Sequence, residues 1–138
     1  MTSTRVKAAA VFFPPTDFLD YGGKATDLKS DDRWGQLVRR LAIGSAVGKE
    51  TAEEMTQKVM QISPARLVTT QAPPFLLIHG DADSVVPLQQ SQVLLAALKK
   101  AGVPAELIVK PGGGHPWPTM HEEVLVLADW FDKQLMGK

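Results

Sequence analysis

The 138-residue sequence contains no cysteine. Disulfide bonds, cysteine-ligated zinc or iron–sulfur sites and thiol nucleophiles are therefore excluded. No apolar run approaches the roughly 20 residues that a membrane-spanning helix requires, which argues against a membrane protein. Net charge is also absent, because 15 Lys and Arg balance 15 Asp and Glu, so no overall positive field attracts nucleic acid.

The sequence also lacks several signatures that particular functions require. It has no cluster of metal-ligand residues, and the glycines at 112–114 lack the Gly and Lys spacing of a phosphate-binding loop. We therefore expect no metal and no cofactor. The first residues do not resemble a secretory leader, since the apolar stretch 8–13 is short and runs into two prolines, so a cytoplasmic protein is expected.

What the sequence does contain is enough apolar material for one folded domain. Its hydrophobic fraction is 44%, and a chain of this length buries roughly two-thirds of its unfolded surface. Three short apolar runs are bracketed by turn residues, as β-strands are: 6–13, 75–78 and 106–109. Four other segments carry apolar residues at helical spacing: 34–42, 52–62, 88–101 and 121–136.

Capping residues mark the expected helix starts. Ser30 or Asp31 is available to cap the first helix. Two capping boxes, each a threonine followed three residues later by a glutamate, precede the second and the last helix: Thr51 with Glu54, and Thr119 with Glu122.

The order of these elements predicts the architecture. The second half alternates strand, helix, strand, helix, which favours a parallel sheet with helices on its faces. The region 14–72 has two helices and no strand pattern, so we expect a cap-like helical excursion between two strands. The prediction is a single α/β domain over 1–138, with a small parallel sheet of about three strands flanked by helices.

The loops after the second and third strands carry residues that can do chemistry. Asp83 follows the second strand, and His115 lies in a glycine-rich loop after the third. Ligands of open parallel sheets bind beyond the carboxyl ends of the strands. A carboxylate that accepts from the imidazole Nδ1 leaves Nε2 free to take a proton from a nucleophile. We therefore predict that Asp83 and His115 meet at this edge.

These loops resemble those of a known family. The stretch HGDADSVVP at 79–87 resembles the acid loop of α/β-hydrolases, and PGGGHPW at 111–117 resembles their histidine loop. The stretch PPTDF at 14–18 is similar to the BD-FAE-like carboxylesterase branch, which includes acetyl-xylan and feruloyl esterases and is related to prolyl oligopeptidases. The resemblance implies the C-terminal part of an α/β-hydrolase, with Asp83 as triad acid and His115 as triad base.

The nucleophile of that family is missing from the pattern. Its serine sits in a G-x-S-x-G elbow, but the only glycines with this spacing, Gly44 and Gly48, enclose Ala46. Ser45 lies one position out of register; it is the candidate nucleophile, with a helix cap as the alternative. We therefore expect a truncated α/β-hydrolase fold that lacks the half bearing the elbow.

Several further residues have two interpretations. Asp17 is a substrate contact by analogy with the same family, or the cap of a short turn. Trp117 is a substrate contact or part of the core. Ser84 and Ser91 are the other serines near the histidine loop, and His79 is expected to be a hydrogen-bonded structural residue.

Two functions remain open on this evidence. One is a serine-hydrolase-like enzyme that cleaves small carboxylic esters with Asp83, His115 and an unidentified nucleophile. The alternative is a non-catalytic module for binding or oligomerisation. Because the strand at 6–13 would form an unpaired apolar edge, which invites another chain, we expect a homo-oligomer, most simply a homodimer.

Overall fold

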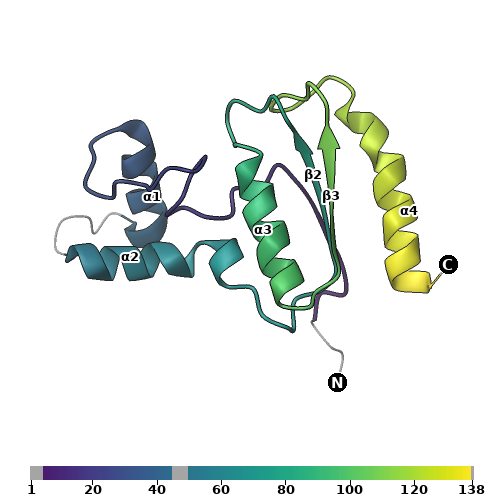
Figure 1. The fold of residues 1–138 in the computed structure, drawn as a ribbon, viewed down its shortest axis with the longest axis horizontal. Coiled ribbons are helices and arrows are strands. Elements are labelled where there is room, and N and C mark those ends of the chain that lie inside the picture. Colours follow the sequence, from purple (N-terminus) through teal and green to yellow (C-terminus); the bar gives the residue numbers. More distant parts are fainter. Residues whose placement is uncertain (1–4, 45–49, 138) are drawn as a thin grey trace.

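The computed structural model describes residues 5–44 and 50–137. Its three strands form one parallel sheet in the order β1 (Ala9–Phe12), β2 (Phe75–Gly80) and β3 (Ala105–Lys110). Helix α3 (Gln89–Lys100) covers one face of the sheet and helix α4 (Glu123–Met136) covers the other (Figure 1). The prediction of a small parallel sheet flanked by helices is confirmed.

The central strand β2 is buried on both faces. Leu76 and Ile78 pack with Trp130 of α4 on one side, whereas Leu77 packs with Leu98 of α3 on the other. The three β2 side chains are at most 1% exposed. A strand covered by two helix layers buries side chains on both faces, which explains the unbroken apolar run from Phe75 to Ile78.

All three strands differ from their expected ranges: β1 begins at Ala9 rather than at residue 6, β3 spans Ala105–Lys110 rather than 106–109, and the ends of β1 and β2 also move. β1 ends at Phe12 because Phe13 has a φ of +35°, which lies in the left-handed region that extended residues do not occupy. β2 continues past Ile78, because His79 and Gly80 still pair with β3. The apolar run ends at Ile78, but the pairing with β3 continues to Gly80, so the run underestimates the length of this strand.

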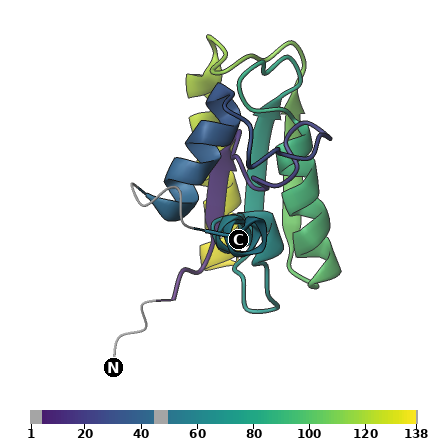
Figure 2. The same cartoon turned by 90° about the vertical axis from the view of Figure 1, so that its left-hand side faces the viewer.

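The region 14–72 forms the expected helical excursion beside the sheet. It contains α1 (Arg33–Ile43), α2 (Ala52–Gln61) and a short 3-10 turn. Figure 1 shows both helices on the far side of α3 from α4, and Figure 2 shows them from that end. They have an apolar cluster of their own, built around Phe18, Val38 and Val59.

The cap of α1 differs from the prediction. Asp32, rather than Ser30 or Asp31, caps this helix, and its Oδ1 accepts from the Gly35 N–H at 2.6 Å. Ser30 instead donates its hydroxyl to Asp32 Oδ2 at 2.8 Å. Three adjacent polar residues can serve as caps here, and the helix start at Arg33 selects the one directly before it.

One of the two predicted capping boxes is confirmed. The Glu54 N–H donates to Thr51 Oγ1 at 3.2 Å, and the Thr51 N–H donates to Glu54 Oε2 at 2.8 Å. The box at Thr119 is wrong, because the Glu122 N–H donates to the Thr119 backbone carbonyl at 2.9 Å. A 3-10 turn (Met120–Glu122) forms there, and α4 begins only at Glu123.

None of the helices described is both long and apolar enough to cross a bilayer.

The two threonines make a matched test of capping. We expect Thr51→Ala to lower the free energy of unfolding by about 1 kcal/mol, because it removes the acceptor of a helix-end N–H group. Thr119→Ala removes an exposed hydroxyl that makes no capping bond and should change stability by less than about 0.5 kcal/mol. Urea denaturation followed by circular dichroism measures both, and equal losses would contradict this assignment.

Candidate functional site

The loops that carry Asp83 and His115 leave the carboxyl ends of β2 and β3, which are neighbours in the sheet (Figure 1). The loops begin in backbone contact, because Gly80 and Gly113 lack side chains. A Cβ added to Gly80 would collide with the carbonyl group of Gly113 and lie 2.8 Å from its Cα. The approach therefore requires glycine at position 80, and at Gly113 an added Cβ would lie 3.0 Å from the Cα of Gly80, which is closer than an ordinary contact.

Hydrogen bonds hold the same two loops in register. The Gly112 N–H donates to Asp81 Oδ1 at 2.7 Å, and the Ala82 N–H donates to the Gly113 carbonyl at 3.0 Å. Gly112 has a φ of +68°, which favours glycine at this turn. Asp81 is therefore a loop-joining residue, and its carboxylate is already engaged.

Asp83 and His115 meet as predicted. His115 Nδ1 lies 2.8 Å from Asp83 Oδ2, and since a carboxylate only accepts hydrogen bonds, Nδ1 carries the proton. The Asp83 side chain has no exposed surface, whereas that of His115 is 26% exposed. Within residues 5–44 and 50–137, Nε2 of His115 has no hydrogen-bond partner. The ring is thus fixed on one side and open on the other.

The second oxygen of Asp83 is held by its own loop. Oδ1 accepts from the N–H groups of Val85 and Val86, both at 2.8 Å. Burial would by itself raise the pKa of Asp83, but the hydrogen bonds from Val86, His115 and Val85 outweigh it and hold the pKa below its usual value. The carboxylate therefore stays charged beside the imidazole.

Phe13 packs against the imidazole ring of His115. Phe13 was not identified from the sequence as part of the site. Its ring centroid lies 4.2 Å from that of His115. The positive φ of Phe13 turns the chain out of β1 at this point. The apolar run 6–13 assigned Phe13 to the strand, and no pattern in the sequence marks it as part of the site.

His79 is a structural residue, as expected. Its Nε2 lies 2.8 Å from the Val86 carbonyl, which only accepts, so Nε2 carries the proton and Nδ1 accepts from Ser91 Oγ at 2.7 Å. The ring is fully buried. Both nitrogens are engaged, so His79 is unavailable as a base and the Ser91 hydroxyl is unavailable as a nucleophile.

Tyr21 joins the helical excursion to the Asp83 loop. Its hydroxyl donates to the Val85 carbonyl at 3.0 Å, and its ring centroid lies 3.8 Å from that of Trp34 on α1. Burial raises the pKa of Tyr21, and the charge of Asp83 adds to the effect. The sequence did not single out Tyr21, because the contact spans 64 positions and no local pattern encodes it.

The two candidate substrate contacts are both engaged within the protein. Asp17 is 7% exposed and forms a two-pronged ion pair with Arg66, with both N···O distances 2.8 Å. Trp117 is 6% exposed and packs against Phe12 in the core beneath α4. The ion pair accounts for Asp17 without a ligand, whereas the indole N–H of Trp117 is buried with no hydrogen-bond partner among the described residues.

The serines divide by position. Ser84 is exposed and directly follows Asp83. Ser45, the candidate nucleophile, lies outside the described residues, as do Ala46 and Gly48. The described ranges contain no group of three or more His, Asp or Glu side chains that could hold a metal ion.

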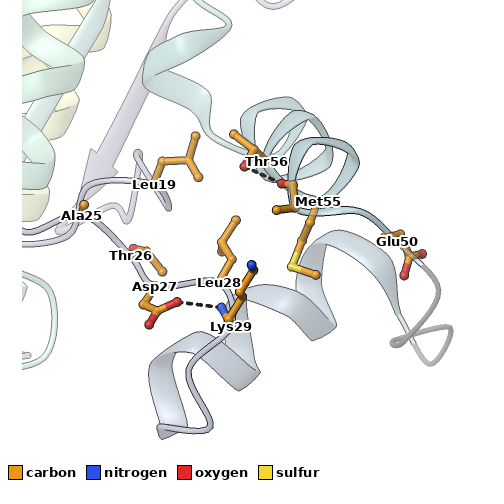
Figure 3. A pocket seen from close by; sticks show the side chains of 10 residues that line it. Leu19, Ala25, Thr26, Asp27, Leu28, Lys29, Glu50, Met55 and Thr56 are labelled. Carbon is orange, nitrogen blue, oxygen red and sulfur yellow. Dashed lines mark hydrogen bonds between the residues drawn. The ribbon is translucent and has the colours of Figure 1, made fainter.

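A pocket of about 440 Å³ lies away from these loops, between the segment at 19–29 and α2 (Figure 3). Leu19, Leu28 and Met55 form its apolar wall. The hydrogen bonds drawn there are local to the chain, such as that from the Lys29 N–H to the Asp27 carboxylate at 2.8 Å. It contains no residue of the Asp83 or His115 loops.

Comparisons with known proteins add independent information. A family model described as BD-FAE matches residues 1–98. The uncharacterized peptidase YuxL of Bacillus subtilis is 30% identical over 89 residues, which cover 59% of this chain and 13% of that protein. Esterase LipC of Mycobacterium tuberculosis is 31% identical over 91 residues, which cover 59% of this chain and 23% of the esterase.

A solved structure matches over more of the chain. The truncated form of a carbohydrate esterase from gut microbiota superposes with a TM-score of 0.72 at 31% identity, covering 96% of this chain and 44% of that one. The chain thus spans less than half the length of each of these three proteins.

The contact between the two loops makes a sharp prediction. We expect Gly80→Ala to lower the free energy of unfolding by about 2 kcal/mol or more, because its Cβ forces the two loop backbones apart. Gly114→Ala is the control, since its Cβ would meet nothing closer than the Pro116 carbonyl at 3.6 Å. Chemical denaturation measures both, and a tolerated Gly80→Ala would refute the close contact.

Proposed function

Because the chain belongs to the BD-FAE family and has the fold of α/β-hydrolase esterases, we propose that it hydrolyses small carboxylic esters through Asp83 and His115. The relatives are esterases and peptidases, so a relationship to hydrolases is secure. The proposal goes beyond that relationship, because it names a carboxylic ester as the bond that is cleaved and Asp83 and His115 as the residues that act on it.

One observation carries the proposal: His115 has a fixed Nδ1–H and an open Nε2. In this arrangement Nε2 removes a proton from a hydroxyl or a water as its oxygen attacks the ester carbonyl. The proton then passes to the departing alkoxide, and His115 returns to its neutral form. Where the attacking oxygen is that of a side chain, a water activated by His115 in the same way then releases the acid from the acyl-enzyme. Asp83 keeps the ring in the correct tautomer and stabilises the imidazolium that forms.

The nucleophile is the open part of the mechanism. Ser45 lies outside the described residues, and Ser84 is exposed beside Asp83 but has no bond to the imidazole. A water activated by His115 is the remaining source within one chain. General-base help supplies only about 10²–10⁴-fold, so hydrolysis without an elbow serine and oxyanion donors should be slow.

The alternative is a non-catalytic module that keeps the fold and the two loops. One observation favours this alternative: within residues 5–44 and 50–137 no serine hydroxyl bonds to Nε2 of His115, so no nucleophile is in place there. In that case the Asp83–His115 bond serves to join the two loops. The two functions differ in whether removal of the imidazole changes chemistry or only stability.

Activity-based labelling separates them. We expect a fluorophosphonate adduct by intact mass, or turnover of 4-nitrophenyl acetate, that falls by about 10²–10⁴-fold in His115→Ala. His121→Ala is the matched control, since His121 is exposed and lies outside the loop contacts. A wild-type protein with neither adduct nor turnover, or a His115→Ala variant as active as His121→Ala, would favour the module.

We also propose that a second copy of the chain pairs with the open edge of β1. The N–H groups of Ala9 and Phe13 bond toward β2 at 2.9 and 2.8 Å, so those of Ala10 and Phe12 point the other way. In the part of the chain that the structure describes, β1 is an edge strand, and unpaired edge groups beside apolar side chains favour association with another strand. A homodimer is the simplest closed assembly.

Light scattering tests this proposal at micromolar concentration. We expect twice the mass of the chain for the wild type. Ala10→Pro, which removes an edge donor, should return the mass of a single chain. A wild-type monomer would contradict the proposal.

A further inference from the structure

A hollow of about 740 Å³ adjoins the Asp83 loop. Ser84 and Val85, the two residues that follow Asp83, form one wall. Helix α1 forms the other through five of its side chains: Arg33, Trp34, Gln36, Leu37 and Arg40. The hollow therefore begins one residue from the carboxylate that holds His115.

The charged side chains that line this hollow are all arginines. Arg33 and Arg40 are seven positions apart, close to two helical turns, so they lie on the same face of α1. Within the described residues neither guanidinium has a hydrogen bond or an ion pair. Arg39, outside the hollow, contrasts with them, because it donates to two backbone carbonyls and pairs with Asp31.

The uncharged part of the lining contains two polar residues, Gln36 and Ser84, and three apolar ones, Trp34, Leu37 and Val85. Leu37 and Val85 are 46% and 57% exposed, and Trp34 is half-buried between them and Tyr21. The Tyr21 hydroxyl bonds to the Val85 carbonyl, so one residue braces both walls. A hollow that combines three apolar side chains with two arginines that have no partner within the described residues fits a ligand with an apolar body and an anionic end.

We propose that this hollow binds a carboxylate-bearing part of the substrate, an inference that rests on ester hydrolysis at His115. Guanidinium groups recognise carboxylates through paired N–H···O bonds, and the body of the ligand packs on Trp34 and Leu37. Esters that carry a free carboxylate on the acid or the alcohol part are then preferred over neutral esters of the same size.

Benzoate and benzamide are matched probes, because they differ in charge but hardly in shape. Their binding is followed by the indole N–H signal of Trp34, which donates to Thr26 Oγ1 in the free protein. We expect benzoate to bind roughly fivefold more tightly than benzamide at low salt, with the difference shrinking as salt is added. Equal binding of the two probes would overturn the proposal.

Charge variants locate the effect. Arg33→Gln with Arg40→Gln should abolish the preference for benzoate. Lys99→Gln with Lys100→Gln removes the same charge from exposed positions at the end of α3 and should leave the preference intact. If both double variants reduce the preference equally, net charge rather than the hollow is responsible and the proposal fails.

His115→Ala separates this inference from the proposed reaction. We expect it to lower ester hydrolysis by about 10²–10⁴-fold while keeping the preference for benzoate, because His115 is not part of the lining. Suppose the wild-type protein prefers benzoate to benzamide but hydrolyses no ester. This result would refute the proposed reaction and the assignment of the ligand as substrate, but not the anion site. Hydrolysis without any preference for benzoate would refute the anion site alone.

Discussion

The candidate site depends on one close contact between two loop backbones. Gly80 and Gly113 touch where a side chain on Gly80 would not fit and one on Gly113 would be crowded, and this sets how far apart the β2 and β3 loops run. The hydrogen bond between Asp83 and His115, 32 positions apart, requires that spacing. A glycine is often taken as a source of flexibility, but here its small size produces a fixed and narrow separation.

The two histidines near Asp83 show how surroundings divide roles between identical side chains. His79 lies 3.5 Å from Asp83 Oδ2 and His115 lies 2.8 Å from it, so both rings border the same carboxylate. His79 is fully buried with both nitrogens bonded, and it stabilises the loop. Among the described residues Nε2 of His115 has no partner, and a quarter of the side chain is exposed, so of these two histidines His115 is the one able to exchange a proton with a ligand.

The predictable part of the protein is the part encoded locally or by order along the chain. The sheet and the Asp83–His115 meeting follow from apolar runs, turn residues and the edge at which parallel strands end. The choice of Asp32 among three neighbouring caps, and the failure of the box at Thr119, depend on where each helix begins. Phe13 and Tyr21 reach the site through a backbone turn and a contact across 64 positions, for which no local pattern exists.

The bond from Tyr21 to Val85 has a consequence for how the site comes apart. It connects the helical excursion, which has its own apolar cluster, to a loop that the sheet also supports. Opening of the excursion alone would release the Asp83 loop from one of its anchors while the three strands stay folded. Amide hydrogen exchange at Val85 and Val86 would then follow the local opening of α1 and α2 rather than global unfolding.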